Sequence, residues 1–196
     1  MSAAADLTVD ILSFWHPGSG SGAGMAHDAL AHRDPLGLPV LPGRHIKGLL
    51  RDALESAEAW GWDNHDGLAV QLFGGRSRDD EVPTAGTLRV SDAALHTATA
   101  QWLAGPEGRA LIPGLFRYLH ATAIEASGVA SDKSLRAIEV VVPLRLHARL
   151  EPVPGAQPPG QWPQRIAEVL PLVRAVGALR NRGLGRARCT LEEVAA

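Results

Sequence analysis

Four basic side chains lie at the start of an expected helix, in the stretch PGRHIKGLLR. They are Arg44, His45, Lys47 and Arg51, and a spacing of three and four residues places Arg44, Lys47 and Arg51 on one helical face. A helix N-terminus already carries partial positive charge and free N–H groups, so bases there are unfavourable unless an anion binds them. We therefore predict that this face contacts a phosphate backbone. A solvated basic face is the simpler alternative.

A second basic segment, LRNRGLGRARC, lies between an expected helix and the last expected strand. Its glycines permit backbone conformations that other residues avoid, and arginines surround them. The planar fork of arginine matches phosphate geometry, so such a loop suits RNA phosphates. The predicted contacts are Arg180, Arg182, Gly183 and Arg186. The alternative is a solvated turn in which glycine ends a helix.

The irregular stretch HDALAHRDP contains His27, Asp28, His32 and Asp34. Loop carboxylates beside a bound phosphate can position a divalent ion, or orient a hydroxyl, for phosphodiester cleavage. The spacing is not a strong metal signature, and an aspartate that forms a turn explains the same pattern. The residues alone leave both interpretations open.

The residues around two motifs exclude two kinds of nucleotide-binding site. GSGSGAG, which begins at Gly18, loosely fits a dinucleotide fingerprint, but the prolines that follow do not permit the helix that the fingerprint must open. Lys47 is neither preceded by glycine nor followed by Ser or Thr, so it does not belong to a phosphate loop of nucleotide hydrolases. We interpret the glycine run as a loop that lets another backbone approach closely.

Hydrophobic periodicity and proline positions predict the elements that carry these residues. In chain order we expect a strand at 7–14, a helix at 43–60, a strand near 86–95, a β-rich stretch at 135–151 interrupted at Pro143, a second long helix from Trp162 to Val176, and a last strand with Ala187, Cys189 and Leu191 on one face. This order is typical of an α+β, ferredoxin-like βαββαβ domain.

Composition predicts one globular domain over residues 1–196, because the chain is 45% hydrophobic and 20% charged. The net charge of −2 argues against nucleic acid only weakly, since residues 174–188 hold five arginines and no acid. A single cysteine, Cys189, excludes an intramolecular disulfide and a cysteine-based zinc cluster. No apolar run is long enough to cross a membrane and no signal-peptide pattern begins the chain, so we expect a cytoplasmic protein with no membrane partner.

Four stretches, taken in order, resemble the RAMP superfamily of CRISPR-associated proteins, above all the repeated backbone subunit of type III effector complexes. They are FWHPGSG with RDPLGLPVLPGRHIKGLLR, then LFGGRSRDDEVPTAGTLRVSDAAL, then TAIEASGVASDKSLRAIEVVVP, and finally GALRNRGLGRARC. They correspond to the family's glycine loop and Pro-Gly helix start, its Phe-Gly and Gly-x-Leu-x-Val-x-Asp-Ala segment, its thumb hairpin and its C-terminal glycine-rich loop.

The resemblance implies an RRM-like core with a thumb-like β-hairpin insertion at about 117–143. It also implies several copies assembled along a crRNA guide, together with other CRISPR effector subunits and a complementary target RNA. The thumb would wedge into the guide–target duplex and splay a base at regular intervals, and it adds Lys133 and Arg136 to the expected RNA contacts. Counted back from the RDP turn, the family's target-cleaving aspartate falls on Asp28, which would act with a divalent metal, expected to be Mg²⁺.

Three other functions remain open at this stage. The chain could be a non-cleaving structural subunit of the same kind of complex. It could instead be a metal-independent endoribonuclease that processes precursor guide RNA and uses His16, His27 or His45. An unrelated ferredoxin-like metabolic domain is the third.

Overall fold

The computed structural model describes residues 4–18, 29–75, 84–122, 124–125, 127–129, 131 and 136–194. The strands are β1 (Ala4–Ile11), β2 (Leu88–Val90), β3 (Phe116–Ala121), β4 (Arg136–Val141), β5 (Arg145–Pro152) and β6 (Ala187–Val194). The α-helices are α1 (Gly43–Ala59), α2 (Leu68–Phe73), α3 (Thr97–Ala104) and α4 (Trp162–Val169). Short 3₁₀ turns cover Arg109–Leu115, Leu170–Leu172 and Arg180–Arg182.

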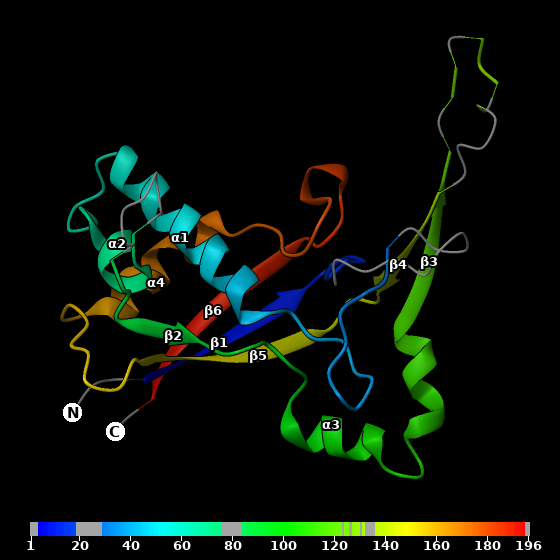
Figure 1. Ribbon diagram of the computed structural model, residues 1–196, viewed down its shortest axis with the longest axis horizontal. Coiled ribbons are helices and arrows are strands. Elements are labelled where there is room, and N and C mark those ends of the chain that lie inside the picture. The colour runs from blue at the N-terminus through cyan, green and yellow to red at the C-terminus, as the bar shows by residue number, and fades with distance from the viewer. Residues whose placement is uncertain are drawn as a thin grey trace.

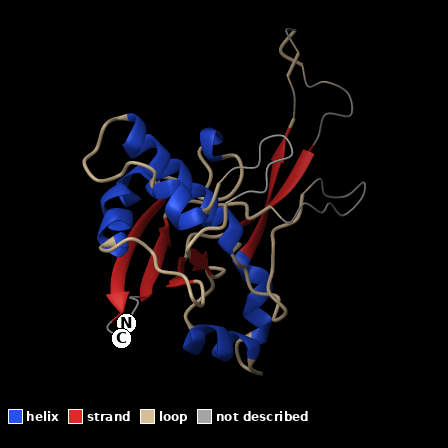
Figure 2. Cartoon of the chain, turned by 60° about the vertical axis from the view of Figure 1, so that its left-hand side comes forward, coloured by secondary structure: helices blue, strands red, loops and turns tan. Residues whose placement is uncertain are grey.

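Four strands form an antiparallel sheet in the order β2-β5-β1-β6. Leu7 of β1 lies opposite Ala148 of β5 and Leu191 of β6, which places these three side chains on the same face. Alternate residues of β1 are buried, as expected for a sheet with one covered face. Helices α1 and α4 cover that face (Figure 1, Figure 2). The mixed α+β class predicted from the sequence is confirmed.

Helix α1 follows from the pattern that predicted it. Its buried residues recur at spacings of three and four, so one stripe faces the sheet while the other side meets solvent. Those residues are Ile46, Leu49, Leu50, Ala53, Leu54 and Ala57. Pro42 occupies the N-cap, and the helix ends one residue before the predicted boundary at Trp60.

The second long helix predicted from Trp162 to Val176 is wrong in length. Helix α4 ends at Val169, and only a short 3₁₀ turn follows. Pro171 lacks the N–H that would continue the helical ladder, and its ring clashes with the preceding turn. Val173 and Val176 are still buried, but they reach the core from irregular backbone. Helices α2 and α3 were not predicted at all.

Strands β3 and β4 form a separate two-stranded antiparallel hairpin, in which Phe116 pairs with Val141 and Ala121 with Arg136. The hairpin projects away from the four-stranded sheet (Figure 1) and occupies the segment predicted to be thumb-like. Its root is anchored by the buried Trp15, whose indole N–H donates to the carbonyl of Val142 at 3.2 Å.

Pairs of opposite charge line the sheet's uncovered face. Arg145 pairs with Asp10, Arg149 with Asp6 and Arg89 with Glu151. None of the four strands contains Phe, Tyr or Trp, the residues that stack bases on an RRM sheet. This face therefore offers no aromatic stacking platform, and its arginines on β2 and β5 are paired with acids. Among the described residues, no helix is both long and apolar enough to cross a membrane.

Candidate RNA interface

Backbone hydrogen bonds bring two distant segments together at the end of the sheet where β1 stops and β6 starts. Ala178 N–H donates to the carbonyl of His16 at 2.8 Å, and Gly185 N–H donates to the carbonyl of Phe14 at 2.7 Å. Leu12 N–H joins the same two segments by donating to the backbone carbonyl of Arg186 at 2.7 Å. The segment after β1 and the C-terminal glycine loop are thus laid side by side.

Two glycines are required for this close approach. Gly177 has φ +80°, and a Cβ there would lie 2.6 Å from the carbonyl oxygen of His16. Gly185 has φ +70°, and a Cβ there would collide with the carbonyl oxygen of Val176. Only glycine adopts such a conformation without strain and leaves room for the neighbouring backbone. Gly183, at φ +85°, has open space around it instead.

A carboxylate of the protein itself binds the N-terminus of α1. Gly43 N–H donates to the Asp92 carboxylate at 2.7 Å, whereas the first turn of the helix contains no acid. A carboxylate at a helix N-terminus offsets the partial positive charge there. The unfavourable field expected around the helix-start bases is therefore already reduced. Arg44 is exposed and Lys47 is half-buried.

His45 links the helix to the glycine loop. Its Nε2 accepts a hydrogen bond from Gly177 N–H at 2.9 Å. Burial, and secondarily the positive charge of Arg180, lower the pKa of His45 below its usual 6.5. The imidazole therefore acts here as a neutral acceptor that holds α1 against the loop. Its Nδ1 then carries the ring proton and is the ring nitrogen left to donate to a phosphate.

The remaining predicted RNA contacts differ in how free their charges are. Arg51 is 13% exposed and its Nε donates to Glu55 at 2.8 Å, so its charge is partly neutralised within α1. The side chains of Arg180, Arg182 and Arg186 are exposed. Among the described residues, no acid lies within ion-pair distance of these three arginines, or of Arg44 and Lys47. Unpaired cations thus gather on α1 and the glycine loop.

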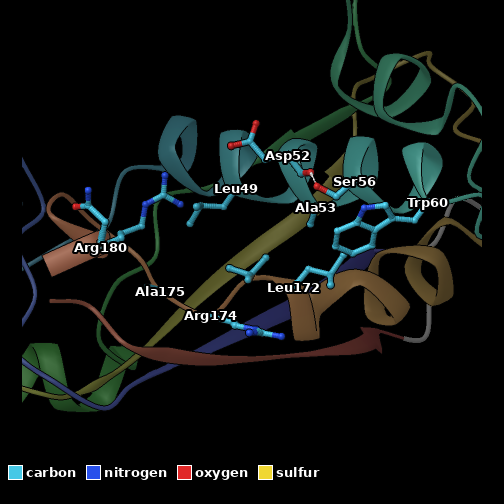
Figure 3. Close-up of a pocket in the computed structure, with 11 residues that line it drawn as sticks. Leu49, Asp52, Ala53, Ser56, Trp60, Leu172, Arg174, Ala175 and Arg180 are labelled. Carbon is cyan, nitrogen blue, oxygen red and sulfur yellow. Dashed lines mark hydrogen bonds between the residues drawn. The ribbon is translucent and has the colours of Figure 1, made fainter. Parts of the chain in front are cut away.

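A hollow of about 200 Å³ lies where the segments meet, lined by Pro17, Gly18, Pro42, Arg44, His45 and Gly177, among others. A larger cleft of about 550 Å³ runs between α1 and residues 172–181. Trp60, which is 64% exposed, lies at one end of this cleft and Arg180 at the other (Figure 3). An exposed indole together with cations suits single-stranded nucleic acid, which combines stacking with charge neutralisation.

One predicted contact lies elsewhere, and two predicted residues fall outside the described part of the chain. Arg136 is exposed at the start of β4, on the hairpin rather than among the cations of the glycine loop. Lys133 and Asp28 lie outside the described residues, as does His27. Within the described part of the chain, no three His, Cys, Asp or Glu side chains gather as metal ligands. Asp34 makes a turn, because its Oδ1 accepts from Leu36 and Leu38 N–H at 2.9 Å.

A buried polar network at the root of the hairpin escaped the sequence analysis. Glu139 of β4 is 2% exposed, and its Oε1 accepts from Arg33 Nη2 at 2.7 Å. The Glu139 backbone carbonyl lies 2.7 Å from His16 Nδ1, which places a second buried side chain in the same network. The available signal was a lone acid in the apolar run AIEVVV, since a buried charge needs a partner.

A sequence model of the RAMP superfamily matches residues 8–188, and the chain belongs to that superfamily. The resemblance seen in the sequence is therefore confirmed. The chain shares its fold with a chain of type III-B Cmr-beta bound to cognate target RNA, with a TM-score of 0.69 and 12% identity over 96% of each chain. A chain of type III-B Cmr-beta in the apo state gives a TM-score of 0.65 and 13% identity over 97% of each chain. No curated protein sequence matches this chain.

Proposed function

We propose that this protein is a guide-RNA-binding backbone subunit of a type III-like CRISPR effector complex, present in several copies along the crRNA. The observation that carries the proposal is the group of unpaired cations where α1 meets the glycine loop. By contrast, the outward arginines of β2 and β5 are paired with acids. A superfamily whose fold occurs in type III-B complexes makes RNA the polyanion that best explains this asymmetry.

The core is proposed to be ferredoxin-like. The sheet order β2-β5-β1-β6 and the positions of α1 and α4 support a βαββαβ arrangement. Hairpin β3–β4 falls in the chain between the second and third core strands, as a thumb inserted into such a core would. In this proposal the hairpin wedges into the guide–target duplex, and Arg136 with Lys133 contacts RNA there.

Guide phosphates are proposed to lie along Arg44, Lys47, Arg180, Arg182 and Arg186, and to pass over Gly183. The open space around Gly183 supports close approach of an RNA strand at that point. Arg51 is a weaker contact because Glu55 competes for its guanidinium. His45 contributes indirectly, since its bond to Gly177 holds the two basic segments together.

Cleavage of complementary target RNA by Asp28 is the enzymatic part of the proposal. A divalent ion bound there would supply Lewis-acid assistance to attack by a ribose 2′-hydroxyl. For the rival precursor-guide nuclease, His16 and His45 form hydrogen bonds within the fold, whereas the third candidate, His27, lies outside the described residues. A non-cleaving subunit remains an outcome of the test.

The test assembles the protein with guide RNA and partner subunits, then adds labelled complementary RNA with Mg²⁺ or with EDTA. We expect regularly spaced, Mg²⁺-dependent cuts for the wild type and none for Asp28→Ala. Asp66→Ala is the matched control, because Asp66 is an exposed aspartate in the loop before α2. Guide binding with no cuts in the wild type, or with cuts that persist in Asp28→Ala, would contradict the catalytic part. Loss of guide binding in Arg180→Ala and Arg182→Ala, with binding kept in Asp28→Ala and Asp66→Ala, would support the proposed interface.

A further inference from the structure

Glu139 joins three parts of the chain that are distant in sequence. Its Oε2 accepts from Ala31 N–H at 3.0 Å, and its Oε1 accepts from Arg33 at 2.7 Å and from the Tyr118 hydroxyl at 3.3 Å. Ala31 and Arg33 belong to the segment that precedes α1, whereas Tyr118 lies on β3 and Glu139 on β4. One carboxylate therefore ties that segment to both strands of the hairpin.

Backbone and ring contacts reinforce the same connection. Glu139 N–H donates to the carbonyl of Ala29 at 3.0 Å, and Ala29 forms a parallel bridge with Ile138. The Arg33 guanidinium stacks over the Phe116 ring, with its carbon 3.8 Å from the ring centroid. Residues 29–33 are thus held against the hairpin root from Phe116 on one strand to Ile138 on the other. We call this set of contacts the Glu139 clasp.

The clasp requires a carboxylate. Ala31 N–H, Arg33 and the Tyr118 hydroxyl all point donors at its two oxygens. Glutamine has the same shape, but one oxygen becomes an NH₂ donor and faces another donor. The negative charge also neutralises Arg33, whose side chain is 35% exposed while that of Glu139 is 3% exposed. Burial of this depth strengthens the interaction and makes the loss of either partner costly.

We propose that Glu139 is a positioning residue that sets where the target RNA is cut. This inference rests on the proposed function, in which the hairpin wedges into the duplex and Asp28 carries the cleavage. Asp28 directly precedes Ala29, one of the clasped residues, in the sequence. In this proposal, holding Ala29 against the hairpin root keeps the cut in register with the splayed base. Without it, the segment before α1 and the hairpin move independently, and the cut loses its register.

The test uses the assembled complex with Glu139→Gln, Glu139→Asp and Arg33→Lys, and with Glu151→Gln as the matched control. Glu151 is a partly exposed acid paired with Arg89 on the uncovered face of the sheet. Cut positions are mapped at single-nucleotide resolution on labelled target RNA. Independently, hydrogen exchange reports the Ala31 amide, which the clasp protects directly. We expect at least about tenfold faster exchange at Ala31 in Glu139→Gln, because a charge-assisted bond is lost.

For Glu139→Gln we expect each single cut to spread over neighbouring phosphodiester bonds while guide binding is unchanged. Glu139→Asp and Arg33→Lys, which keep the charges, should restore part of the register, and Glu151→Gln should match the wild type. Unchanged exchange at Ala31 would refute the clasp itself. Faster exchange with cuts at the wild-type positions would refute positioning. If Asp28→Ala still cuts, the proposed function fails instead, and the exchange result shows separately whether the clasp holds.

Discussion

Replacing Gly185 by alanine tests whether the glycine loop is held by the close approach seen at Val176. Two costs add in this variant. An L-residue at φ +70° costs about 1–2 kcal/mol. The new Cβ also collides with the carbonyl oxygen of Val176, and relief of this collision pulls apart the 2.8 Å bond from Val176 N–H to Gly185, worth about 1 kcal/mol. We expect a total loss of about 2–3 kcal/mol.

Gly183→Ala is the matched control in the same loop. Its φ is +85°, but nothing lies within 4 Å of the added Cβ, so only the conformational cost of about 1–2 kcal/mol applies. Urea unfolding of both variants, followed by tryptophan fluorescence, measures the two losses in the free energy of unfolding. For a chain of this length, about 1 kcal/mol shifts Tm by roughly 2–4 °C. Equal losses in the two variants would refute the argument, because they would show that the carbonyl contact contributes nothing.

Further predictions concern the helix start, the cysteine and the arginines. Because the pKa of His45 is lowered in the folded protein, the unfolded chain binds more protons than the folded chain once the pH is below 6.5, the usual pKa of histidine. The free energy of unfolding should therefore fall as pH drops through that range. His45→Gln, measured by urea midpoints between about pH 5 and pH 7.5, should remove this fall. Burial, with a smaller effect of negative charge nearby, raises the pKa of Cys189 to about 11, so a thiol reagent at neutral pH should label it slowly in the folded protein and quickly in urea. Asp92→Ala should cost about 0.5–2 kcal/mol in urea unfolding, and Asp92→Asn, which keeps an acceptor for the helix, should cost less. Arg182→Ala should reduce the slope of log affinity against log salt for guide RNA by about 0.7, whereas Arg51→Ala, which removes an already paired charge, should change it less.

Local patterns were sufficient wherever neighbouring residues decide the outcome. The spacing of Ile46, Leu49 and Leu50 after Pro42 predicted α1 to within one residue at its end, because helical periodicity is a property of the backbone itself. The break at Pro143 correctly predicted the separation of β4 from β5, because proline lacks the N–H that a strand ladder needs. The predicted helix through Val176 failed where apolar spacing continued but Pro171 ended the hydrogen-bond ladder.

Contacts between distant residues required the tertiary structure. Asp92 caps a helix 49 positions away, and Glu139 holds Arg33 across 106 positions. The sequence alone indicated bases that needed an anion and glycines that free the backbone beside arginines. It did not indicate that His45 Nε2 would accept a hydrogen bond from Gly177, 132 positions later. Backbone geometry imposes a period on nearby residues, whereas the pairing of remote side chains is decided only when the whole chain closes around one core.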